Sequence, residues 1–384
     1  MQDHLEDLIK IRRTIHKYPE IGYQEYRTSK FICEQLDAIG VPYRSGIANT
    51  GVIAELDRGP GRCIVLRAEM DALPIQEDTD LEFASVNAEC MHACGHDVHT
   101  TMLLGAIMQL KDEDFKGKIK FIFQPAEEGV YDDQDKKSGG QRIVEAGELD
   151  EVDYALSLHV HSLLEVGKLS YALGNALACT NAFTIEVNGK AGHAGAAPHL
   201  AVDAVLVSTS LIQSLYTIVS RDISPTQTGV LSISMINGGE APNIVADKIV
   251  IRGTVRALDM EEYNLILKRM NEIIEGVARS FNTTINFSVD LFYPNLENDT
   301  ALHQKLEPLA KEVFPNGVAE TDPLLGGEDF AFYSKVVPSM YYFLGAKDTH
   351  EPCYFLHHPK VVINEDCMPY GVEFLTKAAL HLLK

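Results

Sequence analysis

The segment CIVLRAEMDALP, residues 63–74, begins with apolar side chains and ends with acidic residues shortly before a proline. Its apolar part, residues 63–68, predicts a buried β-strand. Two further segments have the same order, KIKFIFQP at 118–125 and VDYALSLHV at 152–160, and each leads into polar or titratable side chains. The chemically active residues of the chain therefore follow strands.

Helical segments alternate with these strands. Residues 4–39 predict two helices broken at Pro19 and Gly22, and HTTMLLGAIMQL at 99–110 predicts a buried helix. Strands that alternate with helices predict an α/β fold with a mixed, largely parallel sheet flanked by helices. Because ligands on such sheets bind at the carboxyl ends of the strands, we expect the functional site at that edge.

The pattern changes after about residue 180, and a chain of 384 residues is long for a single core. The predicted elements are a strand at 182–189, a helix at 201–221, strands at 229–236 and 247–256, a helix at 260–280 and a strand at 284–291. This β-α-β-β-α-β order is that of a ferredoxin-like domain. We therefore expect an inserted domain at 181–292 and a larger domain formed by 1–180 and 293–384. The polar segment 130–140 predicts a loop.

Composition excludes several classes of protein. The 55 acidic and 33 basic residues give a formal charge of −22, which argues against binding to nucleic acid. No run of about 18 apolar residues predicts a membrane span. The N-terminal segment lacks the apolar centre of a secretory signal, so we expect a cytoplasmic protein. The seven cysteines are odd in number and scattered, which argues against a disulfide framework.

The segment MHACGHDVHT, residues 91–100, concentrates metal-ligand side chains. Cys94 and His96 are two residues apart, and a turn at Gly95 would let both point at one ion. A thiolate with an imidazole suits zinc, manganese, cobalt or nickel. A core cysteine beside satisfied histidines is the alternative, and it is less favoured for C-G-H-D-x-H than for a lone cysteine.

Three other segments strengthen this interpretation. In FQPAEEG (123–129), the adjacent carboxylates of Glu127 and Glu128 repel each other unless a cation is present, and one could bind metal while the other acts as a base. In LHVH (158–161) and FLHHPK (355–360), either histidine of each pair could be a ligand. The four segments together predict a metal hydrolase site.

RAEMDALP (67–74) adds two acidic residues beside that site. Asp71 could orient a histidine ligand through a hydrogen bond, and Glu69 lies two residues earlier on the same side. The alternative is an acidic turn that starts a helix.

Together these segments resemble the M20 family of metallopeptidases and aminoacylases, and most of all its amidohydrolase branch. That branch includes hippurate hydrolases, N-acetyl-diaminopimelate deacetylases and plant auxin-conjugate hydrolases. The resemblance extends over nearly the whole chain. It includes RRTIHKYPEIGYQE (12–25), RAEMDALP, MHACGHDVHT, FQPAEEG, LHVH, GKAGHAGAAPH (189–199), NGGEAPNIVAD (237–247), GTVRALD (253–259), GGEDFAFY (326–333) and LHHPK (356–360).

The resemblance implies a centre of two divalent ions, usually manganese or zinc, in the larger domain. Its ligands would be Cys94, His96, Glu128, His159 and His357. His159 is thereby ranked above His161, and His357 above His358. Glu127 would be the general base that takes a proton from water and passes it to the leaving amine, with Asp71 beside it.

The resemblance also implies that the inserted domain is a lid and dimerisation domain. His193 would stabilise the tetrahedral oxyanion, and in many relatives it comes from the partner subunit. Asn243 and Arg256 would contact the substrate, with Arg256 suited to a carboxylate. The family usually has aspartate at position 69, and the longer Glu69 could shift or crowd the second metal position.

The leading hypothesis is a metal-dependent amidohydrolase that cleaves N-acyl-L-amino acids, such as N-acetyl, N-benzoyl or N-acetyl-diaminopimelate substrates, and acts as a homodimer. The alternative is a dipeptidase or carboxypeptidase of the same family, in which Glu328 or Asp329 would hold the free amino group. A catalytically inactive binding protein is disfavoured, because every matched position is intact.

Overall fold

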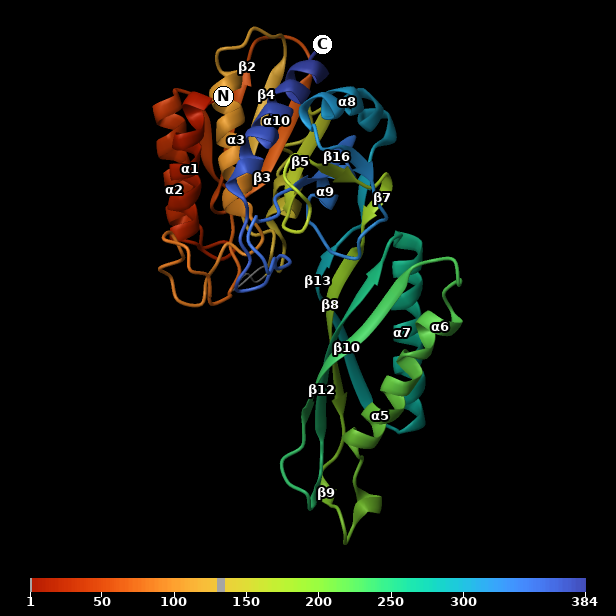
Figure 1. Cartoon of the computed structure of the whole chain (residues 1–384). Coiled ribbons are helices and arrows are strands. Elements are labelled where there is room, and N and C mark those ends of the chain that lie inside the picture. Colours follow the sequence, from red (N-terminus) through yellow and green to blue (C-terminus); the bar gives the residue numbers. More distant parts are fainter. Residues whose placement is uncertain (1, 130–134) are drawn as a thin grey trace. The chain divides into compact units, whose positions relative to one another are not determined.

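The computed structural model of the chain describes residues 2–129 and 135–384, so the first part of the predicted loop at 130–140 lies outside the described residues. The chain forms two compact units (Figure 1). Unit 1 comprises Met1–Gly174, Glu297–Asp322 and Asp329–Lys384, and unit 2 comprises Asn175–Leu296 and Pro323–Glu328. No helix formed by the described residues is both long and apolar enough to cross a membrane.

Unit 1 is built around a mixed sheet of eight strands. In spatial order the strands are β1 (Tyr43–Ile47), β2 (Gly51–Asp57), β4 (Lys118–Gln124), β3 (Cys63–Glu69), β5 (Tyr154–His161), β16 (Ser339–Gly345), β6 (Leu169–Tyr171) and β15 (Val318–Glu320). The central strands β4, β3, β5 and β16 are parallel, while β1, β2 and β6 form antiparallel pairs. The prediction of a mixed, largely parallel sheet is confirmed.

Helices flank this sheet. They are α1 (Gln2–Lys17), α2 (Tyr26–Ile39), α3 (His96–Leu110), α4 (Gly139–Glu145), α8 (Thr300–Val313), α9 (Ala331–Ser334) and α10 (Met368–Leu382). The apolar helix α3 packs against α1, α10 and β3, and nearly all of its residues are buried (Figure 1). It begins at His96 rather than near His99, because Gly95 has φ 87° and turns the chain directly into the helix.

Unit 2 has the predicted β-α-β-β-α-β order. Its antiparallel sheet has the spatial order β10 (Gly229–Gly238), β12 (Lys248–Ala257), β8 (Cys179–Asn188) and β13 (Thr284–Tyr293). The helices α5 (Ala204–Leu215), α6 (Thr217–Arg221) and α7 (Met260–Ser280) lie on one face of this sheet (Figure 1). Side chains alternate between buried and less buried along β8 and β12, because only that face is covered.

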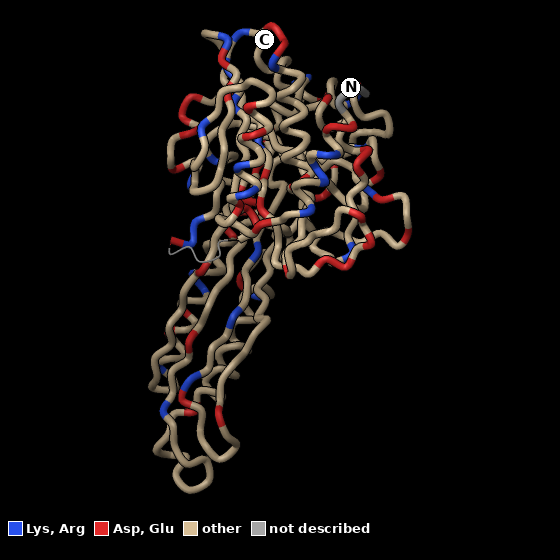
Figure 2. Tube along the Cα trace, turned by 90° about the vertical axis from the view of Figure 1, so that its left-hand side faces the viewer, with Lys and Arg blue, Asp and Glu red and all other residues tan. Residues whose placement is uncertain are grey.

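Short elements complete the chain. They are β7 (Gly174–Leu177), β9 (Gly192–His193), β11 (Ile244–Val245), β14 (Leu296–Asn298) and the 3₁₀ turns Pro198–Leu200 and Glu365–Cys367. In the view of Figure 2, basic residues are interspersed with acidic ones along both units, and the described residues form no continuous basic stripe in that view.

Candidate metal centre

Five side chains predicted as ligands converge at one edge of the unit 1 sheet. Cys94 precedes α3, His96 is its first residue, Glu128 follows β4, His159 lies in β5, and His357 follows β16. Cys94 Sγ lies 3.4 Å from His159 Nε2 and 3.2 Å from His357 Nε2. Glu128 Oε1 lies 3.0 Å from His357 Nε2 and 3.9 Å from His96 Nε2. These segments meet because the carboxyl ends of parallel strands share an edge.

The ligand atoms divide into overlapping groups of three. One group is Cys94, His96 and His159, and a second is Cys94, Glu128 and His357, each with its atoms within 4.8 Å of one another. Both groups contain Cys94, so its sulfur lies between the two places where a cation would fit. The donor set of thiolate, imidazole and carboxylate suits borderline divalent metals.

The hydrogen bonds of two histidines prepare them for a metal. His96 Nδ1 donates to the Asp71 backbone oxygen at 2.9 Å and to Asp71 Oδ1 at 3.1 Å. His159 Nδ1 donates to Val160 O at 2.8 Å. Because Nδ1 of each ring bonds to oxygen, Nε2 is the nitrogen that faces the cluster and would bind a metal once it is deprotonated. His96 Nε2 is buried and has no hydrogen-bond partner among residues 2–129 and 135–384, which fits a place for a metal ion.

The charges of the cluster also favour a cation. Burial opposes the charge on His96, but the carboxylates of Asp71, Glu69 and Glu128 outweigh burial and raise the pKa of His96 to about 10. Burial, followed by the charges of Glu128 and Glu127, raises the pKa of the Cys94 thiol well above its usual range. Both groups therefore hold a proton that a metal ion would replace.

Asp71 connects two of the candidate ligands. It is buried, and besides holding His96 its Oδ2 accepts a hydrogen bond from Glu128 N at 2.9 Å. The orienting role predicted for Asp71 is thus compatible with its contacts. Glu127, the predicted base, is buried, and its carboxylate oxygen lies in a group with ligand atoms of His96 and Glu128 within 4.8 Å.

The carboxylate of Glu69 lies beside His96, and other side chains hold it there. Its carboxylate accepts hydrogen bonds from Arg67 Nη1 and from His99 Nδ1, the latter at 2.7 Å. His99 Nε2 accepts from Val160 N at 2.9 Å. Glu69, His96 and His99 also form a group of three possible ligands, but both ring nitrogens of His99 are already engaged. His99, the third histidine of the MHACGHDVHT segment, thus bonds to Glu69 and to the backbone of β5 and has no ring nitrogen left for a metal.

Geometry separates the histidine pairs that the sequence left open. His161 Nδ1 accepts from Leu163 N at 3.3 Å, and its ring lies against Phe343 and Phe355. The His358 ring stacks on Tyr354 with 4.1 Å between centroids. Neither belongs to a candidate ligand group among the described residues.

The remaining predicted site residues lie in unit 2. His193 is exposed in β9 and pairs with Ile244, and Ala194 N donates to Asn243 O at 3.1 Å, so His193 and Asn243 belong to one loop cluster. Arg256 lies at the other end of the sheet. It pairs with Thr180 at the start of β8, whereas the strand leading to His193 leaves the sheet at Asn188, the last residue of β8. The rise of a strand separates Thr180 from Asn188, near opposite ends of β8, by roughly 25 Å. One copy of unit 2 therefore does not bring His193 and Arg256 together.

Two supporting groups were missed by the sequence reasoning. Asp97 is buried and directly follows the candidate ligand His96. Its Oδ2 forms an ion pair with Arg12 Nε at 2.8 Å and a hydrogen bond with His16 Nδ1 at 2.8 Å. Glu25 is buried and contacts the loop that carries Glu127. Glu25 lies in the RRTIHKYPEIGYQE segment and Asp97 in MHACGHDVHT, and both segments resembled the family without indicating what these two residues contact.

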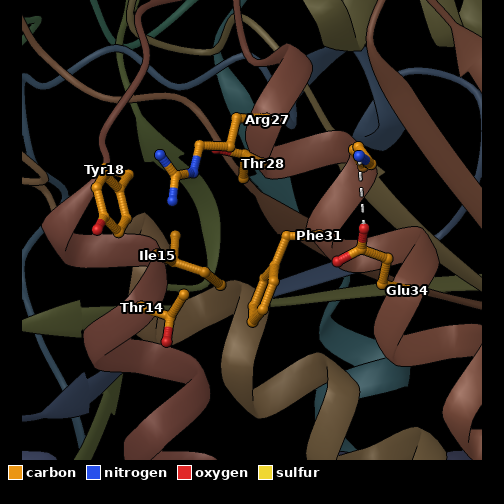
Figure 3. Close-up of a pocket in the computed structure, with 8 residues that line it drawn as sticks. Thr14, Ile15, Tyr18, Arg27, Thr28, Phe31 and Glu34 are labelled. Atoms are coloured by element: carbon orange, nitrogen blue, oxygen red, sulfur yellow. Dashed lines mark ion pairs between the residues drawn. The ribbon is translucent and has the colours of Figure 1, made fainter.

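A surface pocket of about 240 Å³ between α1 and α2 lies apart from this chemistry. Figure 3 shows Tyr18, Arg27, Phe31 and Glu34 among its lining residues. The Arg27 guanidinium lies over the Tyr18 ring at 3.3 Å from the centroid, and Glu34 pairs with Lys30 at 3.8 Å. The pocket contains none of the candidate metal ligands.

Comparisons with known proteins agree with the site. The description Peptidase family M20/M25/M40 matches residues 65–381. IAA-amino acid hydrolase ILR1-like 5 of Arabidopsis thaliana is 37% identical, with 100% of this chain and 88% of that protein covered. N-acetyl-L-cysteine deacetylase of Bacillus subtilis is 37% identical, with 98% and 88% covered. Thermostable carboxypeptidase 1 of Saccharolobus solfataricus is also 37% identical, with 96% and 93% covered.

A solved structure shares the complete fold. The YXEP protein of Bacillus subtilis, described as a dinuclear metal binding peptidase, has a TM-score of 0.83 and 29% identity, and the match covers 100% of this chain and 99% of that chain. Together with the two overlapping ligand groups, this likeness supports a centre for two divalent ions. The family match and the full-length relatives show that this chain belongs to peptidase family M20/M25/M40.

Proposed function

We propose that this protein hydrolyses the amide bond of N-acyl-L-amino acids and releases a carboxylate and the free amino acid. The observation that carries the proposal is the buried group of Cys94, His96, Glu128, His159 and His357 with Glu127 beside it. Two full-length relatives are named for hydrolysis of an amino acid conjugate and for deacetylation of an acyl amino acid. We propose manganese or zinc as the metal, with cobalt or nickel as further possibilities.

The residues divide the chemical work. Divalent ions bound there would polarise the amide carbonyl and lower the pKa of water. Glu127 takes the proton of the attacking water and then delivers it to the amine as the C–N bond breaks. Asp71 holds His96 Nδ1 and Glu128 N, so it keeps two ligands oriented while the base changes its protonation state.

Arg256 suits the α-carboxylate of the substrate. Its Nη1 donates to Asn181 O, Val255 O and Thr254 Oγ1, all of which are uncharged acceptors. The guanidinium is half-buried, and desolvation lowers its pKa from the usual value. A substrate carboxylate would supply a countercharge through paired hydrogen bonds.

The dipeptidase alternative needs an acidic anchor for a free amino group, and Asp329 does not offer one. Asp329 is buried and accepts from Arg67 Nη2 at 2.6 Å, Gln124 Nε2 at 2.7 Å and Gly140 N at 2.7 Å. The Asp329 carboxylate already accepts hydrogen bonds from a guanidinium and two amides of unit 1, so it is not available to bind the amino group of a substrate. This argues against Asp329 as the anchor, so the dipeptidase alternative would depend on Glu328, which is buried.

We also propose a homodimer in which His193 serves the active site of the partner. The separation of His193 and Arg256 within unit 2 is the reason, because both are expected to contact one small substrate. Unit 2 offers apolar side chains for such an interface. Leu206 of α5 is 54% exposed and Ile236 of the edge strand β10 is 56% exposed. Exposed apolar residues beside an open strand edge are typical of subunit contacts.

A substrate panel tests the reaction. Protein stripped of metal is supplied separately with manganese, zinc, cobalt or nickel, and amine release is measured from N-acetyl and N-benzoyl amino acids, N-acetyl-diaminopimelate and dipeptides. We expect metal-dependent cleavage of the acyl amino acids and much slower cleavage of dipeptides. A preference for dipeptides would establish the alternative. Tight metal binding without any cleavage would point to a binding protein.

Metal affinity is expected to rise with pH. Cys94 and His96 hold protons in the metal-free protein, because the pKa of each is raised. A proton must leave each group before it binds a cation, so acidification from about pH 8 to 6 should weaken binding. Competition with a chelating dye measures the affinity, and weakly buffered titration measures proton release. An affinity independent of pH would show that these two groups are not ligands.

A further inference from the structure

Ala126 has an unusual backbone conformation next to the predicted base. Its φ is 49°, in the left-handed region that residues with a Cβ rarely adopt. The residue is completely buried, and Glu127 follows it directly. Such a conformation persists only where the surroundings enforce it. The direction in which Glu127 leaves the chain therefore depends on whatever holds Ala126.

Glu25 is the side chain that holds it. Glu25 Oε1 accepts a hydrogen bond from Ala126 N at 2.9 Å, and its Oε2 accepts from Thr50 Oγ1 at 2.6 Å. Glu25 is completely buried. On the other side of Ala126, its carbonyl accepts from Gly139 N at 3.1 Å. Both polar groups of the Ala126 backbone are thus fixed.

Helix capping does not account for Glu25. Glu25 stands at the N-cap position of α2, where a carboxylate commonly accepts from the first turn, but it makes no capping hydrogen bond. Glu20 caps the helix instead, because its oxygens accept hydrogen bonds from Arg27 N at 3.1 Å and Thr28 N at 2.8 Å in the first turn of α2. The Glu25 carboxylate is therefore committed to the loop before Glu127.

The packing around the loop leaves Ala126 little freedom to relax. Gly22 packs closely against the loop on one side. A Cβ on residue 22 would lie 2.4 Å from Gly129 O and 3.1 Å from Ala126 Cα. Gly139 packs against the loop as well, because a Cβ on residue 139 would lie 1.8 Å from Pro125 O. Only glycine permits these approaches.

Resting on the proposed function, we propose that Glu25 is a positioning residue for Glu127. Asp71 holds the Glu128 amide in the peptide after Glu127, and Glu25 holds the Ala126 amide one peptide before the bond that leads into Glu127. Carboxylates from distant parts of the chain therefore fix the backbone before and after Glu127. Adjacent glutamates need this restraint, because one must reach a metal while the other reaches the attacking water. A general base displaced by about 1 Å loses on the order of a hundredfold in rate.

The test compares three replacements of Glu25. Glu25→Ala removes the acceptor, and Glu25→Asp shortens it by one methylene, so both should lower kcat by about ten- to a hundredfold. KM, metal stoichiometry and metal affinity should stay at wild-type values. Glu25→Gln should retain nearly full kcat, because its amide oxygen can accept from Ala126 N while its amino group donates to Thr50 Oγ1.

A second variant ties the effect to Ala126. Glycine adopts a positive φ without strain, so Ala126→Gly in the Glu25→Ala background should recover a large part of the lost kcat. Glu20→Ala is the matched control: it removes a neighbouring carboxylate that caps α2, and it should lower stability while kcat is unchanged. Wild-type kcat in Glu25→Ala, or equal losses in Glu25→Gln and Glu25→Ala, would overturn the proposal.

Hydrogen exchange gives a readout that does not depend on the reaction. The peptide that contains Ala126 should exchange faster in Glu25→Ala and at the wild-type rate in Glu25→Gln. Unchanged exchange in Glu25→Ala would overturn the positioning role even if the wild-type protein cleaved none of the proposed substrates. If Glu25→Ala does not fold, Thr50→Val removes only the hydroxyl that holds Oε2 and should give a smaller change in the same direction.

Discussion

Glu127→Gln is expected to bind metal ions with wild-type stoichiometry and affinity and to hydrolyse N-acyl amino acids about a thousandfold more slowly, the scale of a lost general base. The amide of glutamine has nearly the shape of the carboxylate but cannot take a proton from water. The five candidate ligands are untouched, so metal binding should persist. Metal analysis of the purified variant and kcat for N-acetyl amino acids measure the two quantities.

Glu128→Gln is the matched control, because it makes the same chemical change one residue along the chain. Glu128 Oε1 lies 3.0 Å from His357 Nε2. Burial alone would raise the pKa of the Glu128 carboxyl, but the hydrogen bond and charge of His357 outweigh it and lower that pKa to about 2. We expect this variant to lose metal affinity along with activity. If Glu127→Gln lost metal and Glu128→Gln kept it, the roles of the two glutamates would be reversed.

The order of elements could be predicted because it is written in local patterns. Apolar runs such as 63–68 and 118–125 follow the period of buried strands, and the β-α-β-β-α-β order of 182–291 is self-contained. The first and last residues of the helices and strands were harder to predict. The start of α3 depends on the positive φ of Gly95, and a glycine does not show in the sequence which conformation it takes.

The ligand cluster was predictable for a chemical reason. Thiols, imidazoles and paired carboxylates have few other uses when they follow buried strands, so Cys94, His96 and the pair of Glu127 and Glu128 could be singled out before any distance was known. The resemblance to a family then assigned the metal to Glu128 and the base to Glu127. Choosing His159 over His161 required the resemblance to a family, because alternate residues of a strand face the same side. In the structure His159 Nε2 lies 3.4 Å from Cys94 Sγ, whereas His161 belongs to no candidate ligand group among the described residues.

The roles of Glu25 and Glu69 could not be predicted from the sequence. Both have hydrogen-bond partners far away in the chain, and the sequence does not show the backbone conformation of those partners. Glu25 and Ala126 are 101 residues apart, and nothing in the letters PAEEG indicates a positive φ at an alanine. Glu69 was expected to crowd a metal position on the basis of its length. That same length lets it reach His99 Nδ1 at 2.7 Å.

His193→Ala is expected to lower kcat by about a hundredfold or more, the usual effect of removing one donor to a tetrahedral oxyanion. Metal content should not change, because His193 lies in unit 2 and belongs to no ligand group among the described residues. KM should change less than kcat, because the oxyanion exists only in the transition state. Steady-state kinetics with an N-acetyl amino acid give both values, and a near-normal kcat would remove His193 from the mechanism.

Mixing two inactive variants decides whether His193 acts within its own chain. In a mixed dimer of Glu127→Gln and His193→Ala, the chain with His193→Ala keeps its Glu127, and its partner supplies an intact His193. If His193 crosses between subunits, one site in each mixed dimer is complete. Random exchange makes half of the dimers mixed, so about a quarter of wild-type activity should return. If His193 served its own chain, every site would lack one group and the mixture would stay inactive. Recovery that requires both variants would therefore establish the dimer and the origin of its oxyanion donor together.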